Sequence, residues 1–115
     1  MNMSIGLPQG ATVCLVEDDG AILNSCSQSL MREGFEVRAH VSAQSYLTAE
    51  RPEFPYVVIT DVNLPDEDGL SLMRKILAAN AQVPVIIMTA YSDLESAVAA
   101  FQGGAFEYLP KPFDV

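Results

Sequence analysis

The sequence predicts an α/β protein whose parallel sheet is covered by helices on both faces. Short apolar, β-branched runs alternate with longer segments of helical period along the 115 residues, in the order β-α-β-α-β-α-β-α-β. Several runs are apolar throughout, which is typical of strands that are buried on both faces of a parallel sheet. Right-handed crossovers leave few topologies for such a chain, and we expect a doubly wound sheet.

The first part of the chain is predicted to contain two strands and the helix between them. Residues 12–16 form an apolar run that stops at a cluster of acidic residues. Residues 21–33 carry apolar side chains at positions i, i+4 and i+8, which share one face of a helix, and Gly34 ends that helix. Residues 35–39 alternate between apolar and polar side chains, as a half-exposed strand does.

A weak helix, a buried strand and a stronger helix are expected next. Ser42 is placed to cap a short helix that extends to about Arg51, before two prolines. Residues 56–60 form a continuous apolar strand, and Asp61 follows at once. A polar loop then leads to a helix over residues 70–79, whose apolar side chains share one face.

The last part of the chain repeats this alternation. Residues 84–88 are predicted to form the fourth strand. Ser92 begins the next helix with Glu95 as its capping-box partner, and a Gly-Gly pair ends it. Residues 106–109 are expected to form a short fifth strand that runs into Lys111.

Composition limits the classes of function. Six Lys and Arg against 15 Asp and Glu give a formal net charge of −9, which repels nucleic acids and anionic membranes at long range. No apolar run reaches the roughly 18 residues of a membrane span, and residues 1–10 lack the basic and apolar parts of a signal peptide. The cysteines are too few for a disulfide framework. We therefore expect a cytoplasmic domain over residues 11–115, preceded by a lead-in over residues 1–10.

Polar side chains of complementary chemistry stand at the ends of four predicted strands. Glu17 and Asp18 follow the first strand, and Asp61 follows the third. Thr89 ends the fourth strand, and Lys111 comes after the fifth. Each of them alone is commonly a helix cap or a surface residue. Because the carboxyl ends of parallel strands meet at one edge of the sheet, we expect all of them to converge there.

Three carboxylates held together repel one another, and a hard divalent cation is the usual remedy. Oxygen ligands of this kind suit Mg²⁺, which keeps several waters and takes few protein carboxylates. Such a site invites a phosphoryl group, whose remaining oxygens the Lys111 ammonium and the Thr89 hydroxyl can hold. Asp61 can also act as a nucleophile and form an aspartyl phosphate.

Four segments, in this order and at this spacing, carry a family signature. They are CLVEDD at residues 14–19, ITDVNLPDEDG at 59–69, VIIMTA at 85–90 and GAFEYLPKPF at 104–113. With them the chain resembles the receiver domain of two-component response regulators, and its C-terminal third is most similar to receivers of enhancer-binding regulators of the nitrogen-regulation type. The resemblance implies a five-stranded flavodoxin-like fold with strand order 2-1-3-4-5.

The resemblance also implies a role for each matching acidic residue. Asp61 matches the phosphoacceptor. Glu17 and Asp18 match the acidic pair that organises Mg²⁺, although many receivers have Asp at the position of Glu17. Asn63 matches the residue whose backbone carbonyl binds the metal, whereas Asp19 matches a variable position outside the core site.

The remaining matches concern the phosphoryl group and the switch. Thr89 and Lys111 match the hydroxyl and the lysine that contact the phosphoryl group. Thr89 and Tyr108 match the switch pair, in which the threonine moves toward the phosphoryl group and the aromatic ring rotates inward. The Lys111-Pro112 bond matches a cis peptide bond of the family.

The resemblance implies a switch that takes part in its own phosphorylation, and no independent enzyme. A sensor histidine kinase or histidine phosphotransfer protein would donate the phosphoryl group, and an output domain outside this chain would contact DNA and regulate transcription. The only histidine, His40, is expected at the surface end of the second strand. The family's fifth helix is missing here, which predicts a fragment of a longer regulator whose exposed apolar surface favours a homodimer.

Three other classes compete with this interpretation. An aspartate-nucleophile phosphatase would need an Asp-x-Asp pattern, and Asn63 stands at its second position. A nucleotide-binding module would need a glycine-rich phosphate loop after a strand, and the sequence has none. A pseudo-receiver that binds without being phosphorylated would be expected to lack a key residue, and all of them are present.

Overall fold

As far as β4, the chain folds into alternating strands and helices in the order that the sequence predicts. The computed structural model describes residues 10–90, 98–99 and 102–111. The elements are β1 (Thr12–Val16), α1 (Gly20–Arg32), β2 (Glu36–His40), α2 (Ala43–Thr48), β3 (Tyr56–Asp61), α3 (Gly69–Ala79), β4 (Val85–Ala90) and β5 (Glu107–Lys111). The expected start of a further helix, at Ser92 and Glu95, lies outside the described residues.

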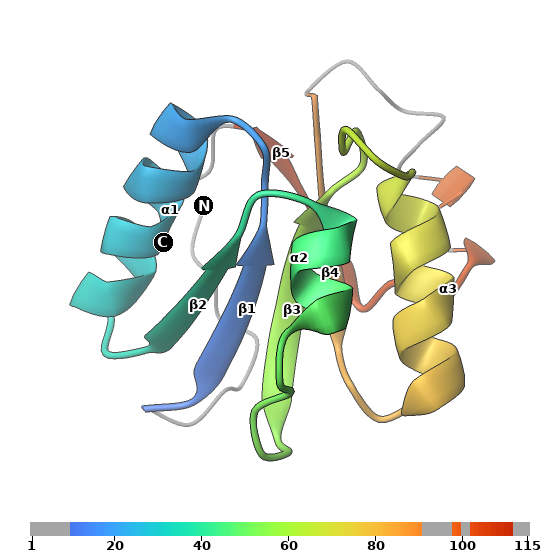
Figure 1. Cartoon of the computed structure of the whole chain (residues 1–115), viewed down its shortest axis with the longest axis horizontal. Coiled ribbons are helices and arrows are strands. Elements are labelled where there is room, and N and C mark those ends of the chain that lie inside the picture. Colours follow the sequence, from blue (N-terminus) through green and yellow to red (C-terminus); the bar gives the residue numbers. More distant parts are fainter. Residues whose placement is uncertain (1–9, 91–97, 100–101, 112–115) are drawn as a thin grey trace.

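The strands form one parallel sheet in the order β2-β1-β3-β4-β5. Figure 1 shows α1 on one face of this sheet and α2 and α3 on the other. The central strand β3 is buried at every position, whereas the edge strand β2 is partly exposed, as its alternating sequence predicts. The doubly wound fold and the strand order are therefore confirmed.

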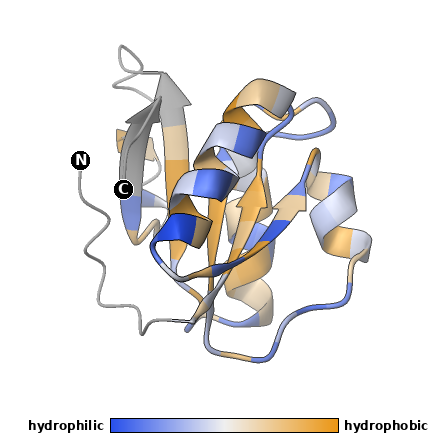
Figure 2. Ribbon diagram, turned by 90° about the vertical axis from the view of Figure 1, so that its left-hand side faces the viewer, coloured by the Kyte–Doolittle hydropathy of each residue, from blue (hydrophilic) through white to orange (hydrophobic). Residues whose placement is uncertain are grey.

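Two hydrophobic cores lie on opposite sides of the sheet, because successive side chains of a strand point to opposite faces. The core beneath α1 contains Val13, Leu15, Cys26, Leu30, Val57, Ile59, Ile86 and Met88. The core beneath α2 and α3 includes Cys14, Val16, Tyr46, Val58, Leu72, Met73, Ile76 and Ile87. Figure 2 shows the apolar colour concentrated on the strands, whereas the helices carry both polar and apolar colours. Both cysteines are buried, unbridged core residues, as expected.

Side chains and one glycine set the ends of the helices. Gly34 follows α1 with a φ of 95°, a left-handed conformation that ends a helix at little cost for glycine. The predicted cap Ser42 accepts a hydrogen bond from the Ser45 amide at 3.0 Å and begins α2. That helix ends at Thr48, earlier than expected, because Ala49 is extended and the Arg51 guanidinium binds the carbonyls of the last turn. No helix within the described ranges is long and apolar enough to cross a membrane.

Two expectations near the C-terminus differ from the structure or lie beyond it. The fifth strand is longer than expected, since β5 includes Lys111 itself and pairs it with Ala90 of β4. The predicted cis bond between Lys111 and Pro112 involves a residue outside the described part of the chain.

Candidate functional site

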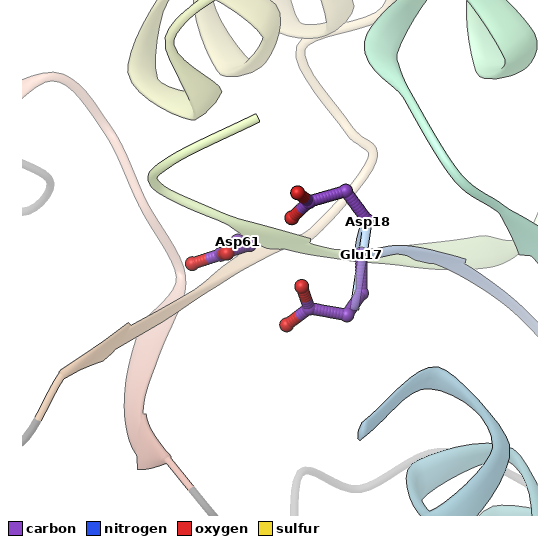
Figure 3. A group of neighbouring side chains, drawn as sticks. All are labelled: Glu17, Asp18 and Asp61. Carbon is purple, nitrogen blue, oxygen red and sulfur yellow. The ribbon is translucent and has the colours of Figure 1, made fainter. Parts of the chain in front are cut away.

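Three carboxylates converge at the carboxyl edge of the sheet. One carboxylate oxygen from each of Glu17, Asp18 and Asp61 lies within 4.8 Å of the others. Figure 3 shows the three side chains around a common space, with Glu17 and Asp18 at the end of β1 and Asp61 at the end of β3. Glu17 and Asp61 are only 1% and 4% exposed, whereas Asp18 is exposed. The sequence-based expectation that these acidic side chains meet is confirmed.

The acidic residues that follow β1 have two different roles. The Glu17 amide donates to the His40 carbonyl at 2.9 Å, which continues the pairing of β1 with β2, and the Glu17 Oε2 accepts the Asp19 amide at 3.0 Å. Asp19 Oδ1 in turn accepts the Ala21 and Ile22 amides and caps α1. Asp19 is therefore a structural cap at the start of α1.

The loop after Asp61, residues 62–68, is held closely against the end of β3. The Gly69 amide donates to the Val62 carbonyl at 2.7 Å, and Asn63 forms an antiparallel bridge with Asp68, which also caps α3. A Cβ placed on Gly69 would overlap the Asp61 carbonyl oxygen and lie 2.9 Å from the carbonyl carbon. A side chain of any size at this position would thus push against the backbone of Asp61.

Asp66 fastens the same loop to α2. Its Oδ1 accepts the Ala43 amide at 3.1 Å, and its Oδ2 accepts the Gln44 amide at 2.7 Å. The hydrogen bond from the Gln44 amide is the main cause that lowers the pKa of the Asp66 carboxyl below its ordinary value of 3.8. The sequence predicts only a loop at Asp66, because the partners of this residue lie more than twenty positions away and no local pattern signals them.

The lowered pKa of Asp66 predicts a defined pH dependence. A depressed folded-state pKa means that the contact stabilises the fold above the unfolded-state value near 3.8, and that this contribution disappears as pH falls through the lower folded value. An NMR titration of the side-chain carboxyl should give a midpoint below 3.8. The stability difference between the parent and Asp66→Asn should shrink over the same pH range. A midpoint at or above the ordinary value would contradict the hydrogen bonding seen here.

The backbones of the other predicted site residues stand at the same edge of the sheet. Met88 of β4 pairs with Asp61, and the next pair along β4 and β5 joins Thr89 to Pro110. Lys111 ends β5, one position beyond that pair. The side chains of Thr89, Lys111 and Tyr108 lie outside the described part of the structure, so the roles predicted for them stay predictions.

His40 is more buried than the surface position that the sequence suggests. It ends β2 as expected, but its ring is half-buried, lies edge-on to Tyr46 and has Nδ1 3.0 Å from the Ser45 hydroxyl. Burial, followed by the nearby Arg51 and Arg38 guanidinium groups, lowers the pKa of the imidazole from its ordinary value of 6.5. The histidine therefore packs against α2, through Ser45 and Tyr46.

The acidic cluster fits a hard divalent cation. It offers oxygen donors from two buried carboxylates and one exposed carboxylate, which are the donors that hard cations prefer. A bound cation would also offset the mutual repulsion of the three charges, which is strong where two of them are shielded from water. Fold and site together define a doubly wound α/β domain with a cluster of three carboxylates at the carboxyl edge of its sheet.

The family follows from comparison with known proteins. The chain belongs to the response regulator receiver domain family, which it matches over residues 13–115. The DNA-binding transcriptional regulator NtrC of Proteus hauseri is 47% identical over 107 residues, which make up 93% of this chain and 23% of that protein. The chain therefore spans less than a quarter of the length of this curated relative. The resemblance to receivers of the nitrogen-regulation type is confirmed.

Solved structures agree with this assignment. The structure of NtrX from Brucella abortus matches with a TM-score of 0.85 and 30% identity, covering 92% of this chain and 24% of that chain. The BeF3-activated receiver domain of DrrB, a Thermotoga maritima protein, matches with a TM-score of 0.81 and 33% identity, covering 92% of this chain and 88% of that chain. Neither the family nor these structures favour the phosphatase or the nucleotide-binding alternative.

Proposed function

We propose that this domain is a Mg²⁺-dependent phosphoacceptor and conformational switch of a two-component phosphorelay, with Asp61 as the acceptor. The observation that carries the proposal is the buried Asp61 carboxylate within a group of three carboxylates at the carboxyl edge of the sheet. Membership of the receiver family supports it. The donor would be the phosphohistidine of a sensor histidine kinase or of a histidine phosphotransfer protein.

The metal would be held by Glu17, Asp18 and Asp61, together with the backbone carbonyl of Asn63. When bound, it would supply positive charge that offsets the negative charge of the phosphoryl oxygens. A carboxylate oxygen of Asp61 attacks phosphorus in line with the leaving imidazole of the donor. The new P–O bond forms as the P–N bond breaks, and the bonding pair leaves with the imidazole nitrogen. Lys111 would hold a further phosphoryl oxygen through its ammonium group.

The switch would then act through Thr89 and Tyr108. The phosphoryl group on Asp61 attracts the Thr89 hydroxyl, and the space that the threonine leaves admits the Tyr108 ring. Two conformations of the β4–β5 side thus differ in their interaction with the phosphoryl group, so phosphorylation shifts their populations. Hydrolysis of the acyl phosphate at the same site would reset the switch.

The switch would regulate transcription, and the protein would act in the cytoplasm. NtrC of Proteus hauseri is described as a DNA-binding transcriptional regulator, and the present chain matches less than a quarter of it. The formal net charge of −9 disfavours direct DNA contact by this domain, so a separate output domain would bind DNA. Association of two receiver domains would be one way to pass on the signal.

Phosphorylation by a small-molecule donor tests the proposal directly. The chain is incubated with acetyl phosphate and Mg²⁺, and its intact mass is measured with and without a chelator. We expect a gain of one phosphoryl group that the chelator prevents. A chain that gains no mass under these conditions would favour the pseudo-receiver alternative instead.

A further inference from the structure

The N-terminus of α2 is capped from another part of the chain. Ser42 satisfies the amide of Ser45 through its hydroxyl and the amide of Tyr46 through its carbonyl, at 3.0 and 3.3 Å. The first two amides of the helix, those of Ala43 and Gln44, donate instead to the two carboxylate oxygens of Asp66. Asp66 thus completes a helix cap that the local sequence leaves unfinished.

The helix α2, to which Asp66 is hydrogen-bonded, packs firmly against the core. Ala43 is fully buried and Tyr46 is 2% exposed, so both are packed into the core beneath the helix. At the other end, the Arg51 guanidinium lies 4.4 Å from the Tyr46 ring centroid and donates to the carbonyls of Tyr46 and Ala49 at 2.8 and 2.9 Å. A loop that is hydrogen-bonded to this short helix is therefore held in place relative to the core.

Asp66 is also close in sequence to the metal site. It lies between Asn63 and Asp68, the two residues that the antiparallel bridge joins, so it sits at the tip of the closed loop over residues 62–68. The base of that loop is fixed to the end of β3 by the Gly69 amide and the Val62 carbonyl. The loop is consequently held at its base by β3 and at its tip by α2.

We propose that Asp66 is a positioning residue for the metal site, which holds the loop over residues 62–68, and with it the backbone carbonyl of Asn63, in place through its two hydrogen bonds to α2. This inference rests on the proposed function, because it takes the Asn63 carbonyl to be a metal ligand. Asp66 touches neither the metal nor the phosphoryl group. It lowers the cost of ordering the loop when the metal binds, since the ligand is already held in one place.

Two variants of Asp66 separate positioning from a simple effect of charge. Asp66→Ala removes the charge and both acceptor oxygens, whereas Asp66→Asn removes the charge but keeps one acceptor. Outer-shell groups that orient metal ligands change metal affinity by about 10- to 100-fold. Asp66 acts one step further away, so we expect Mg²⁺ binding about 10-fold weaker in Asp66→Ala and about threefold weaker in Asp66→Asn. Glu53→Gln, which removes an exposed charge outside this loop, should bind Mg²⁺ like the parent.

Mg²⁺ titration followed by amide chemical shifts gives these affinities without any phosphodonor. Equal weakening in the two Asp66 variants would mean that only the charge matters, and an unchanged affinity would mean that Asp66 serves stability alone. Either result overturns the proposal. Hydrogen exchange at the Ala43 and Gln44 amides should speed up in Asp66→Ala, which checks that the contact exists in solution. If the alanine variant unfolds, an unchanged Mg²⁺ affinity in the nearly isosteric Asp66→Asn still overturns the proposal.

The same titration distinguishes failure of this inference from failure of the proposed function. A parent chain that binds Mg²⁺ but gains no phosphoryl group overturns the phosphoacceptor role, and the affinities of the variants still decide the role of Asp66. A parent chain that binds no Mg²⁺ overturns both.

Discussion

Replacing Asp61 by asparagine is expected to abolish phosphorylation of this domain completely. The amide oxygen carries no full charge and is a far weaker nucleophile than a carboxylate, so no stable phosphoryl linkage can form at this position. The other two carboxylates of the cluster come from the end of β1, and the Glu17 Oε2 already accepts the Asp19 amide. We therefore expect neither of them to replace Asp61 as the acceptor. Intact-mass measurement after incubation with acetyl phosphate and Mg²⁺ should show no gain in Asp61→Asn.

The loss must be separated from a loss of folding. Asparagine has nearly the shape of aspartate and removes one of three mutually repelling charges, so we expect the variant to unfold at the parent's temperature or above it. Glu53→Gln, which removes an exposed acidic group, should be phosphorylated like the parent. Labelling of Asp61→Asn at the parent's level would show that another residue is the acceptor.

The fold could be predicted from the sequence because its signals are local. Apolar runs such as residues 56–60 identify buried strands, and the alternation of strands and helices implies parallel pairing. Glu17, Asp18 and Asp61 each follow a strand, so the carboxyl edge of a parallel sheet had to bring them together, and the structure does so. For this part of the site, the positions of the strand ends are sufficient to predict which side chains meet.

The contacts that hold the site in place could not be predicted in the same way. Asp66 caps a helix that begins more than twenty residues earlier, and only the packed structure brings the two together. The sequence predicts that α2 reaches about Arg51, but the helix ends at Thr48, because helix propensity does not reveal that the Arg51 side chain binds the carbonyls of the last turn. Such contacts depend on tertiary geometry, and residue type alone does not specify them.

Gly69→Ala is expected to be the most destabilising single-methyl change in the site. The added Cβ would overlap the carbonyl oxygen of Asp61 and lie 3.0 Å from the Cα of Val62, and both neighbours are backbone atoms that cannot turn aside. This overlap can be removed only if α3 or the end of β3 moves. We expect a loss of about 3 kcal/mol in the free energy of unfolding, the upper part of the usual range for overpacking. Thermal unfolding should show a decrease in Tm of about 15 °C.

Gly20 of α1 provides a matched control, because α1 also begins at the edge of the sheet that carries the acidic cluster. Gly20 is the first residue of α1, as Gly69 is of α3, but a Cβ on Gly20 meets no atom within 4 Å. Gly20→Ala should therefore leave stability unchanged or raise it by about 0.5 kcal/mol, because alanine restricts the unfolded chain. If Gly69→Ala were as stable as Gly20→Ala, the close approach of α3 to Asp61 would not exist in solution. If it is destabilised and also phosphorylated slowly at a temperature where it is still folded, then the backbone contact that supports α3 also sets the position of the acceptor carboxylate.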